Sequence, residues 1–309
     1  MNVFSQSIRR SLSKDPNLLP DLANFTHLLI ASDYSGHHQG CRYESYSYLI
    51  VGMGESWLSW EASRLSVRQR FKLAKRSFAY KKLNDSRKRE ALDSFLAASE
   101  VLAGLCVTVL IDKSITSMFD KEGRVDFSDP LLHPYSQFGI ASFERLLRVV
   151  HLASFFVAGL SAPGQNITWF TDRDDIAANH ARLTQLTSAW ATVLSNYLSH
   201  PLGHLRCGTT ESDNGTLQIE DLTAIPDLAA GALAEMATCY DKESHVPDGP
   251  LIVPPPNGVS EKTRSIIRWL SNSVPPLKRM IYVIHPVGNT STLTIKRLQL
   301  HSGQAGLVW

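Results

Sequence analysis

The sequence has few cysteines, and none of them stands in a metal-binding pattern. Its 309 residues include four, Cys41, Cys106, Cys207 and Cys239, and no two of these form a CxxC pair. Zinc knuckles need such pairs, and disulfide-stabilised secreted domains need a denser cysteine framework. Neither class is indicated, so a reducing, cytoplasmic environment is our expectation.

Long hydrophobic runs are also missing. The most apolar window, residues 146–160, is too short to span a membrane and contains Arg148 and His151. The N-terminus carries basic residues without the apolar core of a secretory signal. We therefore expect no membrane partner and interpret residues 146–160 as a buried helix.

The chain as a whole lacks an excess charge of either sign, because its net charge is only +2. Its basic residues are nevertheless concentrated in one segment. Residues 64–89 contain eleven Lys or Arg and a single acid, Asp85, so this segment carries +10 and the rest of the chain −8. Such a distribution indicates a binding surface for a polyanion.

The hydrophobic pattern predicts that much of this basic segment is one helix, over residues 62–80. Several cations share a face of that helix, beside an apolar stripe that contains Val67, Phe71 and Phe78. A solvated charged helix is the alternative, but the acids that usually stabilise such a face are missing. A row of cations is typical of surfaces that bind phosphate backbones. The predicted nucleic-acid-binding residues are Arg64, Arg68, Lys72, Lys75, Arg76, Lys81 and Lys82.

Hydrophobic periodicity predicts strands and helices in alternation along the rest of the chain. Strands are expected over residues 27–32, 43–53, 106–112, 166–172, 205–211, 279–285 and 292–300, with a further strand after Gly54. Helices are expected over residues 62–80, 86–104, 139–160, 176–198, 226–237 and 260–272. This order predicts an α/β fold, in which a mixed sheet is flanked by helices.

A proline-rich segment, residues 246–258, predicts a boundary, because that composition resists regular structure. The expected organisation is an N-terminal segment (1–24), a main domain (25–242) and a small C-terminal α+β extension after a proline-rich linker (243–309). The 309 residues are enough for one large core with such an extension.

Aspartates stand at the ends of the predicted strands. Asp33, Asp112 and Asp172 each directly follow an apolar run, and Asp227 lies at the start of a helix, six residues after Asp221. Each alone is better explained as a helix cap. Strand ends converge in α/β sheets, however, and carboxylates gathered there would repel one another unless a cation joined them. Together with the basic segment they predict an Mg²⁺ or Mn²⁺ site suited to phosphodiester hydrolysis.

Four short motifs follow one another in a recognisable order. They are SDYSG (32–36), VTVLIDK (107–113), ITWFTD (167–172) and PDLAAGAL (226–233). Over about residues 25–240 the chain resembles a bacterial family of unknown function with a ribonuclease H-like fold, whose members are regarded as metal-dependent nucleases. The resemblance implies a ribonuclease H-like sheet, and it implies the metal ligands and catalytic acids Asp33, Asp112, Asp172 and Asp227, with Asp221 as a rival for the last position.

The chain departs from the family pattern at Tyr34, where the family usually has glutamate. Activity therefore depends on a neighbouring carboxylate, or the site has kept only binding. A partner protein or a homo-oligomer, and a role in anti-phage defence, would fit the resemblance.

Three functions follow as hypotheses. The leading one is a nuclease in which metal-activated water hydrolyses DNA or RNA. The second is a non-catalytic nucleic-acid-binding or assembly subunit with a degenerate site. The third is a phosphatase of the haloacid dehalogenase type, because Asp172 and Asp174 stand two residues apart after a strand.

Overall fold

The computed structural model describes residues 5–6, 8–9, 12–13, 15–119, 125–243, 250–253, 258–272, 274–287 and 293–302. A mixed sheet with the strand order β5-β4-β1-β2-β3-β7-β8-β6 forms its centre. The strands are β1 (His27–Ser35), β2 (Tyr43–Gly52), β3 (Gly104–Asp112), β4 (Asn166–Thr171), β5 (Leu205–Thr209), β6 (Pro250–Val253), β7 (Leu277–Pro286) and β8 (Leu293–Ser302). The predicted α/β class, with a mixed sheet flanked by helices, is confirmed.

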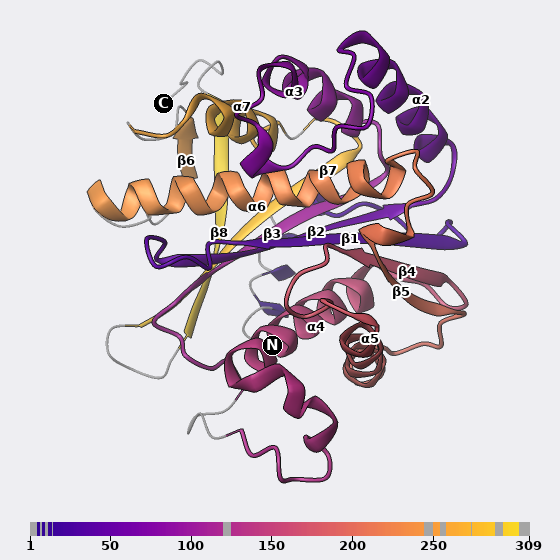
Figure 1. Cartoon of the computed structure of the whole chain (residues 1–309), viewed down its shortest axis with the longest axis vertical. Coiled ribbons are helices and arrows are strands. Elements are labelled where there is room, and N and C mark those ends of the chain that lie inside the picture. The colour runs from indigo at the N-terminus through magenta and orange to yellow at the C-terminus, as the bar shows by residue number, and fades with distance from the viewer. Residues whose placement is uncertain are drawn as a thin grey trace.

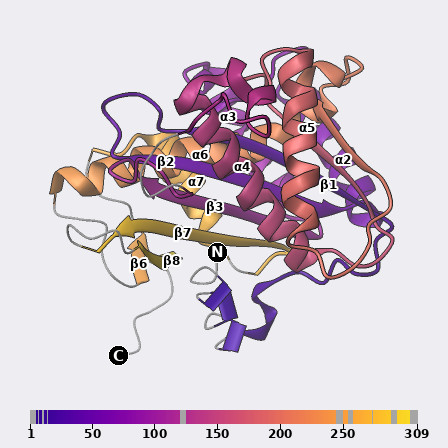
Figure 2. The ribbon, with the colours of Figure 1, turned by 90° about the horizontal axis from the view of Figure 1, so that it is seen from below.

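The helices lie in two layers. They are α2 (Glu55–Arg70), α3 (Ser86–Ser99), α4 (Gly139–Leu160), α5 (His180–Ser195), α6 (Gln218–Glu243) and α7 (Glu261–Leu270), with the short helices η1 (Pro16–Leu18), η2 (Tyr80–Lys82), η3 (His133–Phe138) and η4 (Thr210–Ser212). Helix α6 lies along one face of the sheet with α2, α3 and α7 beyond it, while α4 and α5 cover the opposite face (Figure 1, Figure 2).

Strand directions bring several strand ends to one edge of the sheet. Strand β2 runs antiparallel to both β1 and β3, and β4 runs parallel to β1. Strand β5 in turn runs parallel to β4. The carboxyl ends of β1, β3, β4 and β5 therefore point the same way, as expected for a ligand site at this edge.

Each strand divides its side chains between the two helical layers. On β1, Leu29 and Ala31 pack in the core shared with α6, whereas Leu28 and Ile30 pack in the core shared with α4 and α5. This alternation follows from the pleat of the strand. It also means that Asp33 points toward α6 and Tyr34 away from it.

Within the part of the chain described, no helix combines the length and the apolar character that a membrane crossing requires. The longest apolar helix, α4, begins and ends where the sequence predicts. Its Arg148 is buried and pairs with Glu44 on β2 and with Glu144 one turn earlier, at 3.0 Å each. The window 146–160 is thus part of a buried helix, as expected.

Two predictions near the basic segment are wrong. No strand follows Gly54, because α2 begins at Glu55, and Trp57, Trp60 and Val67 are buried on one side of that helix. The predicted helix over residues 62–80 ends at Arg70 instead. Residues 71–79 form a loop, which tertiary contacts of Arg68 hold in place, as described below.

The start of α6 also differs from the prediction. The helix begins at Gln218, so Pro226 lies inside it and not at its first turn. Asp213 caps this earlier start, because its carboxylate accepts hydrogen bonds from the backbone N–H groups of Leu217 and Ile219, at 2.8 Å each.

The C-terminal segment contributes β7 and β8 to the sheet that the preceding strands form. Strand β7 pairs in parallel with β3 from Gly104 to Ile111, and β8 pairs with β7. Helix α7 contributes Ile266 and Ile267 to the core beneath α6. Residues 258–302, where described, are therefore packed on the main sheet.

Candidate active site

A cavity of about 380 Å³ opens at the carboxyl end of β1, beside the N-terminal half of α6. Most of the side chains around it are polar or charged. The lining residues are Asp33, Tyr34, Ser35, Phe78, Ala79, Tyr80, Lys81, Lys82, Asp172, Thr210, Glu220, Thr223, Ala224 and Asp227.

Asp33 and Asp227 meet inside this cavity. Both carboxyl groups line the cavity, and each influences the pKa of the other. The backbone N–H of Tyr34 donates to Asp33 at 2.5 Å, and the N–H of Tyr80 donates to Asp227 at 2.6 Å. Two carboxyl groups far apart in the sequence are thus held together by β1, α6 and η2.

Burial makes both carboxyl groups bind a proton more readily than free carboxyl groups do. Burial, followed by the negative charges of Asp227 and Asp172, raises the pKa of Asp33 well above its ordinary value. Burial also raises the pKa of Asp227, although the N–H of Tyr80 acts in the opposite direction. A cation placed between the two groups would favour their ionised forms.

Asp172 lies on the rim of the same cavity. Its side chain is exposed, and Oδ1 accepts hydrogen bonds from the Arg173 N–H at 2.8 Å and from the Thr210 hydroxyl at 3.4 Å. Asp174 does not line the cavity, and burial raises its pKa to about 7. The two aspartates of the phosphatase hypothesis therefore do not share one site.

Two lysines complete the cavity. Lys81 and Lys82 are exposed and line it from η2. The charge of Lys81 acts to lower the pKa of Asp227 and that of Lys82 acts to lower the pKa of Glu220, in each case against the larger effect of burial. The cavity is thus lined by acidic side chains next to the basic side chains of Lys81 and Lys82. Such a combination suits a phosphate ester approached by a divalent cation.

Asp112 does not belong to this group. It lies two strands away from Asp33, across from Tyr43, whereas Asp33 pairs with Ser47, four residues further along β2. Its carboxylate is buried, pairs with Arg42 at 2.9 Å and accepts from the Ser114 N–H and hydroxyl. Asp112 therefore acts as a cap and an ion-pair partner.

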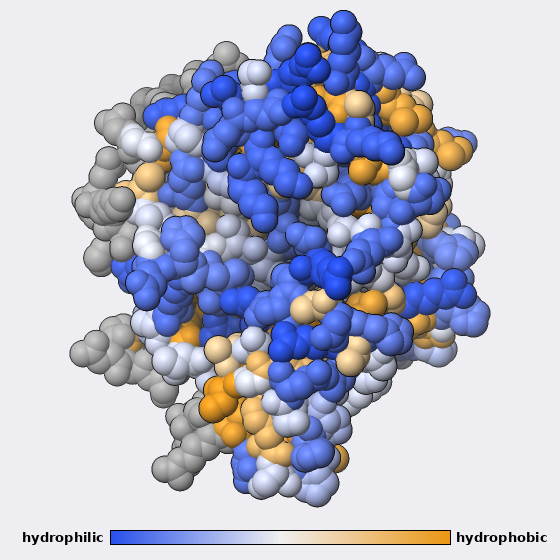
Figure 3. All heavy atoms as spheres, viewed as in Figure 1, coloured by the Kyte–Doolittle hydropathy of each residue, from blue (hydrophilic) through white to orange (hydrophobic). Residues whose placement is uncertain are grey.

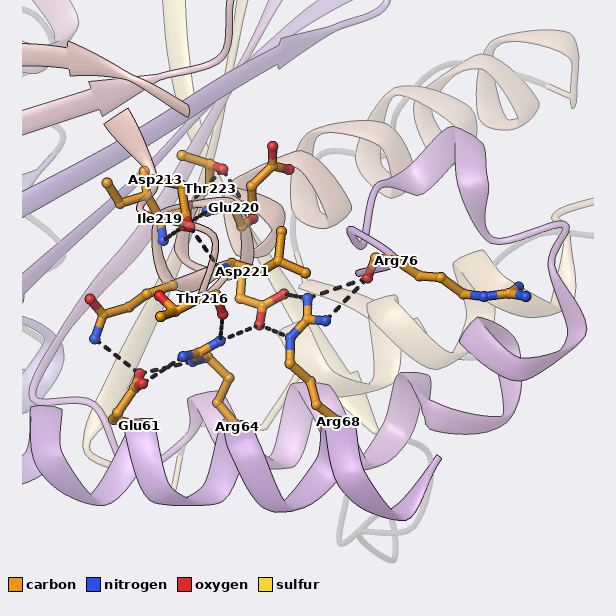
Figure 4. Close-up of polar contacts among 12 residues, drawn as sticks. Glu61, Arg64, Arg68, Arg76, Asp213, Thr216, Ile219, Glu220, Asp221 and Thr223 are labelled. Atoms are coloured by element: carbon orange, nitrogen blue, oxygen red, sulfur yellow. Dashed lines mark hydrogen bonds and ion pairs between the residues drawn. The ribbon is translucent and has the colours of Figure 1, made fainter. Parts of the chain in front are cut away.

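Asp221 is also separate from the cavity, which distinguishes it from its rival Asp227. Its fully buried carboxylate pairs with Arg64 at 3.0 Å and with Arg68 at 2.5 Å (Figure 4). Glu61 binds the other side of Arg64. The prediction that Arg64 and Arg68 form part of an exposed cationic row is wrong, because Asp221 neutralises them in the interior.

The remaining predicted cations are exposed, although they do not lie on a helix. Lys72 and Lys75 lie in the loop after α2, and Arg76 pairs there with Asp85. Asp85 itself caps α3 by accepting from the N–H groups of Arg87 and Lys88. The face of the molecule that carries α2 and α3 is mainly hydrophilic (Figure 3).

Tyr34, the departure from the family pattern, faces the opposite layer from Asp33. Its ring packs at 5.6 Å from the ring of Tyr46 and 6.3 Å from that of Tyr48, and its hydroxyl bonds to Ser32 at 2.7 Å. A side chain at position 34 therefore points away from the Asp33–Asp227 pair.

Glu220 is a cavity residue that the sequence analysis did not identify. Burial raises its pKa, and it stands with Thr223, Ala224 and Asp227 along one side of α6. These four positions have the spacing of one helical face. The spacing was present in the sequence, but a helix starting at Pro226 leaves three of the four positions outside the helix.

The described residues contain no group of three or more His, Cys, Asp or Glu side chains arranged to hold a metal ion. The donor chemistry of the Asp33–Asp227 pair nevertheless fits a divalent cation. Two carboxyl groups that line one cavity are hard oxygen ligands, and the charge of a cation would offset the burial and the nearby negative charges that raise their pKa values.

Comparison of the chain with models of protein families and with curated proteins finds no match in either case.

Proposed function

We propose that this protein is a metal-dependent nuclease with a ribonuclease H-like fold, which hydrolyses phosphodiester bonds of DNA or RNA. The observation that carries the proposal is that Asp33 and Asp227 line one cavity together with Lys81 and Lys82. Asp172 lies on the rim of that cavity and supplies a third carboxylate.

The strand arrangement supports the fold assignment. In the order β5-β4-β1-β2-β3, the last three strands, β1, β2 and β3, are antiparallel neighbours, and β4 and β5 run parallel to β1. This is the arrangement expected of a ribonuclease H-like domain, and the acidic pair joins its first strand to a later helix.

Asp33 and Asp227 are the residues that would hold Mg²⁺ or Mn²⁺, with Asp172 as a further carboxylate. The ion would supply activation of water and stabilisation of the leaving oxygen. Lys81 and Lys82 would bind the phosphate groups on either side of the scissile bond. The N–H groups of Tyr34 and Tyr80 orient the two carboxylates.

A cleavage assay tests the proposal. Labelled single-stranded and double-stranded DNA and RNA are incubated with Mg²⁺, Mn²⁺ or EDTA. We expect metal-dependent cutting that Asp33→Asn and Asp227→Asn each reduce at least a hundredfold. The matched control is Asp93→Asn, because Asp93 is an exposed aspartate on α3 and lies outside this cavity.

A non-catalytic nucleic-acid-binding or assembly subunit is the second candidate. It is favoured by Tyr34, which stands where the family that the chain resembles usually has glutamate. Salt-sensitive binding that EDTA does not change, without cleavage under any condition, would support it. Cleavage that survives Asp33→Asn would overturn the site assignment.

A further inference from the structure

The loop that replaces the predicted helix has a defined shape. Residues 71–82, here called the strap, run from the end of α2 through η2 and carry Lys72, Lys75, Arg76, Lys81 and Lys82. All five of these cations are exposed, and the last two line the cavity. The strap is anchored to the fold near each of its ends.

Arg68 forms the first anchor. Its Nε and Nη2 donate to the two carboxylate oxygens of Asp221 at 2.5 Å each. Nη1 also donates to the carbonyl oxygen of Ala74 at 3.0 Å, and both terminal nitrogens donate to that of Arg76 at 3.3 Å. One guanidinium thus connects the strap to α6 (Figure 4).

The backbone held by this anchor is strained. Lys72 and Ala74 have φ angles of 52° and 45°, in the left-handed region that non-glycine residues rarely adopt. Each costs about 1 kcal/mol or more, and such conformations persist where the surroundings over-determine them. Between the two residues, Leu73 is fully buried and its N–H bonds to the carbonyl oxygen of Arg68.

Tyr80 forms the second anchor. Its hydroxyl bonds to Glu235 on α6 and to Thr263 on α7. The ammonium of Lys262 lies 4.1 Å from the ring centroid, and Gly231 leaves the ring its space, since an added Cβ would stand 2.3 Å from its Cγ. The backbone N–H of Tyr80 reaches Asp227, so this anchor also touches the acidic pair.

We propose that the strap is a preformed phosphate-binding element, and that Arg68, Asp221 and Tyr80 are the positioning residues that fix its shape. The proposal rests on the proposed function and identifies how the substrate is held there. A strap ordered before binding loses less conformational entropy on binding than a mobile basic loop would. It also keeps Lys81 and Lys82 at a fixed place beside Asp33 and Asp227.

Two variants remove one anchor each. Arg68→Lys keeps the charge but loses the planar fork that binds Asp221 and the two carbonyl groups together. Tyr80→Phe keeps the ring and loses only the hydroxyl. Arg89→Lys is the matched control, because Arg89 is exposed on α3 and lies outside the strap.

The experiment has two readouts on the full-length protein. Fluorescence anisotropy in EDTA measures the affinity for short single-stranded and duplex DNA and RNA, and hydrogen exchange measures the opening of residues 71–82. We expect Arg68→Lys and Tyr80→Phe to weaken binding about tenfold and to speed exchange in the strap, with exchange in β1 and α4 unchanged. Arg89→Lys should change neither readout. In the cleavage assay, the two anchor variants should raise KM and leave kcat within a factor of two.

Other outcomes would overturn the inference. If the strap exchanges faster but affinity does not fall, the strap is not a binding element. If exchange in the strap does not change, Arg68 and Tyr80 do not position it. A wild-type protein that binds none of the probes would overturn the proposed function itself, while the exchange readout would still test the two anchors.

Discussion

At the scale of single residues, the pair of Asp33 and Asp227 lowers the stability of the folded protein at neutral pH. An acid whose pKa is raised in the folded state binds protons more tightly there than in the unfolded chain. The free energy of unfolding therefore falls as the pH rises from the ordinary carboxyl pKa toward the raised one. Burial and the neighbouring carboxylates place Asp33 in this class.

We therefore expect Asp33→Asn to raise the melting temperature of the metal-free protein at neutral pH, and to have little effect at pH 4, where Asp33 is protonated. Mn²⁺ should stabilise the wild type and not the variant. Thermal unfolding with and without Mn²⁺ at both pH values checks this. A variant less stable than the wild type at neutral pH would argue against a strained acidic pair.

Position 34 provides a second residue-scale test. Because Tyr34 lies against Tyr46 and Tyr48, glutamate there would place a carboxylate in an aromatic layer. We expect Tyr34→Glu to lower the free energy of unfolding by about 2 to 3 kcal/mol and to give no gain in cleavage. Tyr34→Phe, which loses the bond to Ser32, should cost about 1 kcal/mol. Chemical denaturation measures both, and a Tyr34→Glu protein with raised activity would contradict the assignment of faces.

At the scale of elements, the sequence predicted best where burial is periodic. Helix α4 begins and ends at the predicted residues, and β1 to β5, β7 and β8 were found within a few residues, because each packs a regular pattern against the core. Strand β6 was missed, because it lies in the proline-rich segment that was expected to resist regular structure. Elements fixed by a single distant contact were missed. No local pattern shows that Arg68 would bind the carbonyl groups of residues 74 and 76, or that Asp213 would start α6 ahead of Pro226.

The residues predicted for the candidate site also fall into two groups, those that the structure brings together and those that it does not. Asp33, Asp172 and Asp227 were predicted from strand ends and a helix start, and the structure gathers them around one cavity. Asp112 and Asp221 look the same in the sequence, but each has an arginine partner instead. Only the tertiary position of the arginines separates the two kinds of aspartate.

Helix α6 allows a matched pair of glycine substitutions. Replacing glycine by alanine inside a helix normally stabilises it, by up to about 1 kcal/mol. At Gly231 the new Cβ would collide with the ring of Tyr80, whereas at Gly159 in α4 nothing lies within 4 Å. We expect Gly231→Ala to lower the free energy of unfolding by about 1 to 3 kcal/mol and Gly159→Ala to raise it slightly. Equal effects in denaturant titrations would show that Tyr80 is not confined there.

At the scale of the whole molecule, the sheet crosses the predicted boundary near residue 242. Strand β3 is a central strand only because β7 pairs with it over eight positions. A chain ending at residue 242 would expose that edge and the apolar surface that α7 covers. We expect such a chain to aggregate or to lose cooperative unfolding, as gel filtration and thermal melts would show. If the chain ending at residue 242 were a stable monomer, the predicted domain boundary would be supported instead.

One side of α6 carries Asp227, Gly231 and Glu235 at intervals of four residues, about 6 Å apart along its axis. The first residue belongs to the acidic pair, and the other two seat Tyr80, which leads directly into Lys81 and Lys82. Under the proposed function, this one helix therefore sets the positions of both the catalytic pair and the phosphate-binding lysines. If α6 moved or tilted, Asp227 and the residues that hold Tyr80 would move together. The distance between them is therefore set by α6 alone and does not change when other elements move.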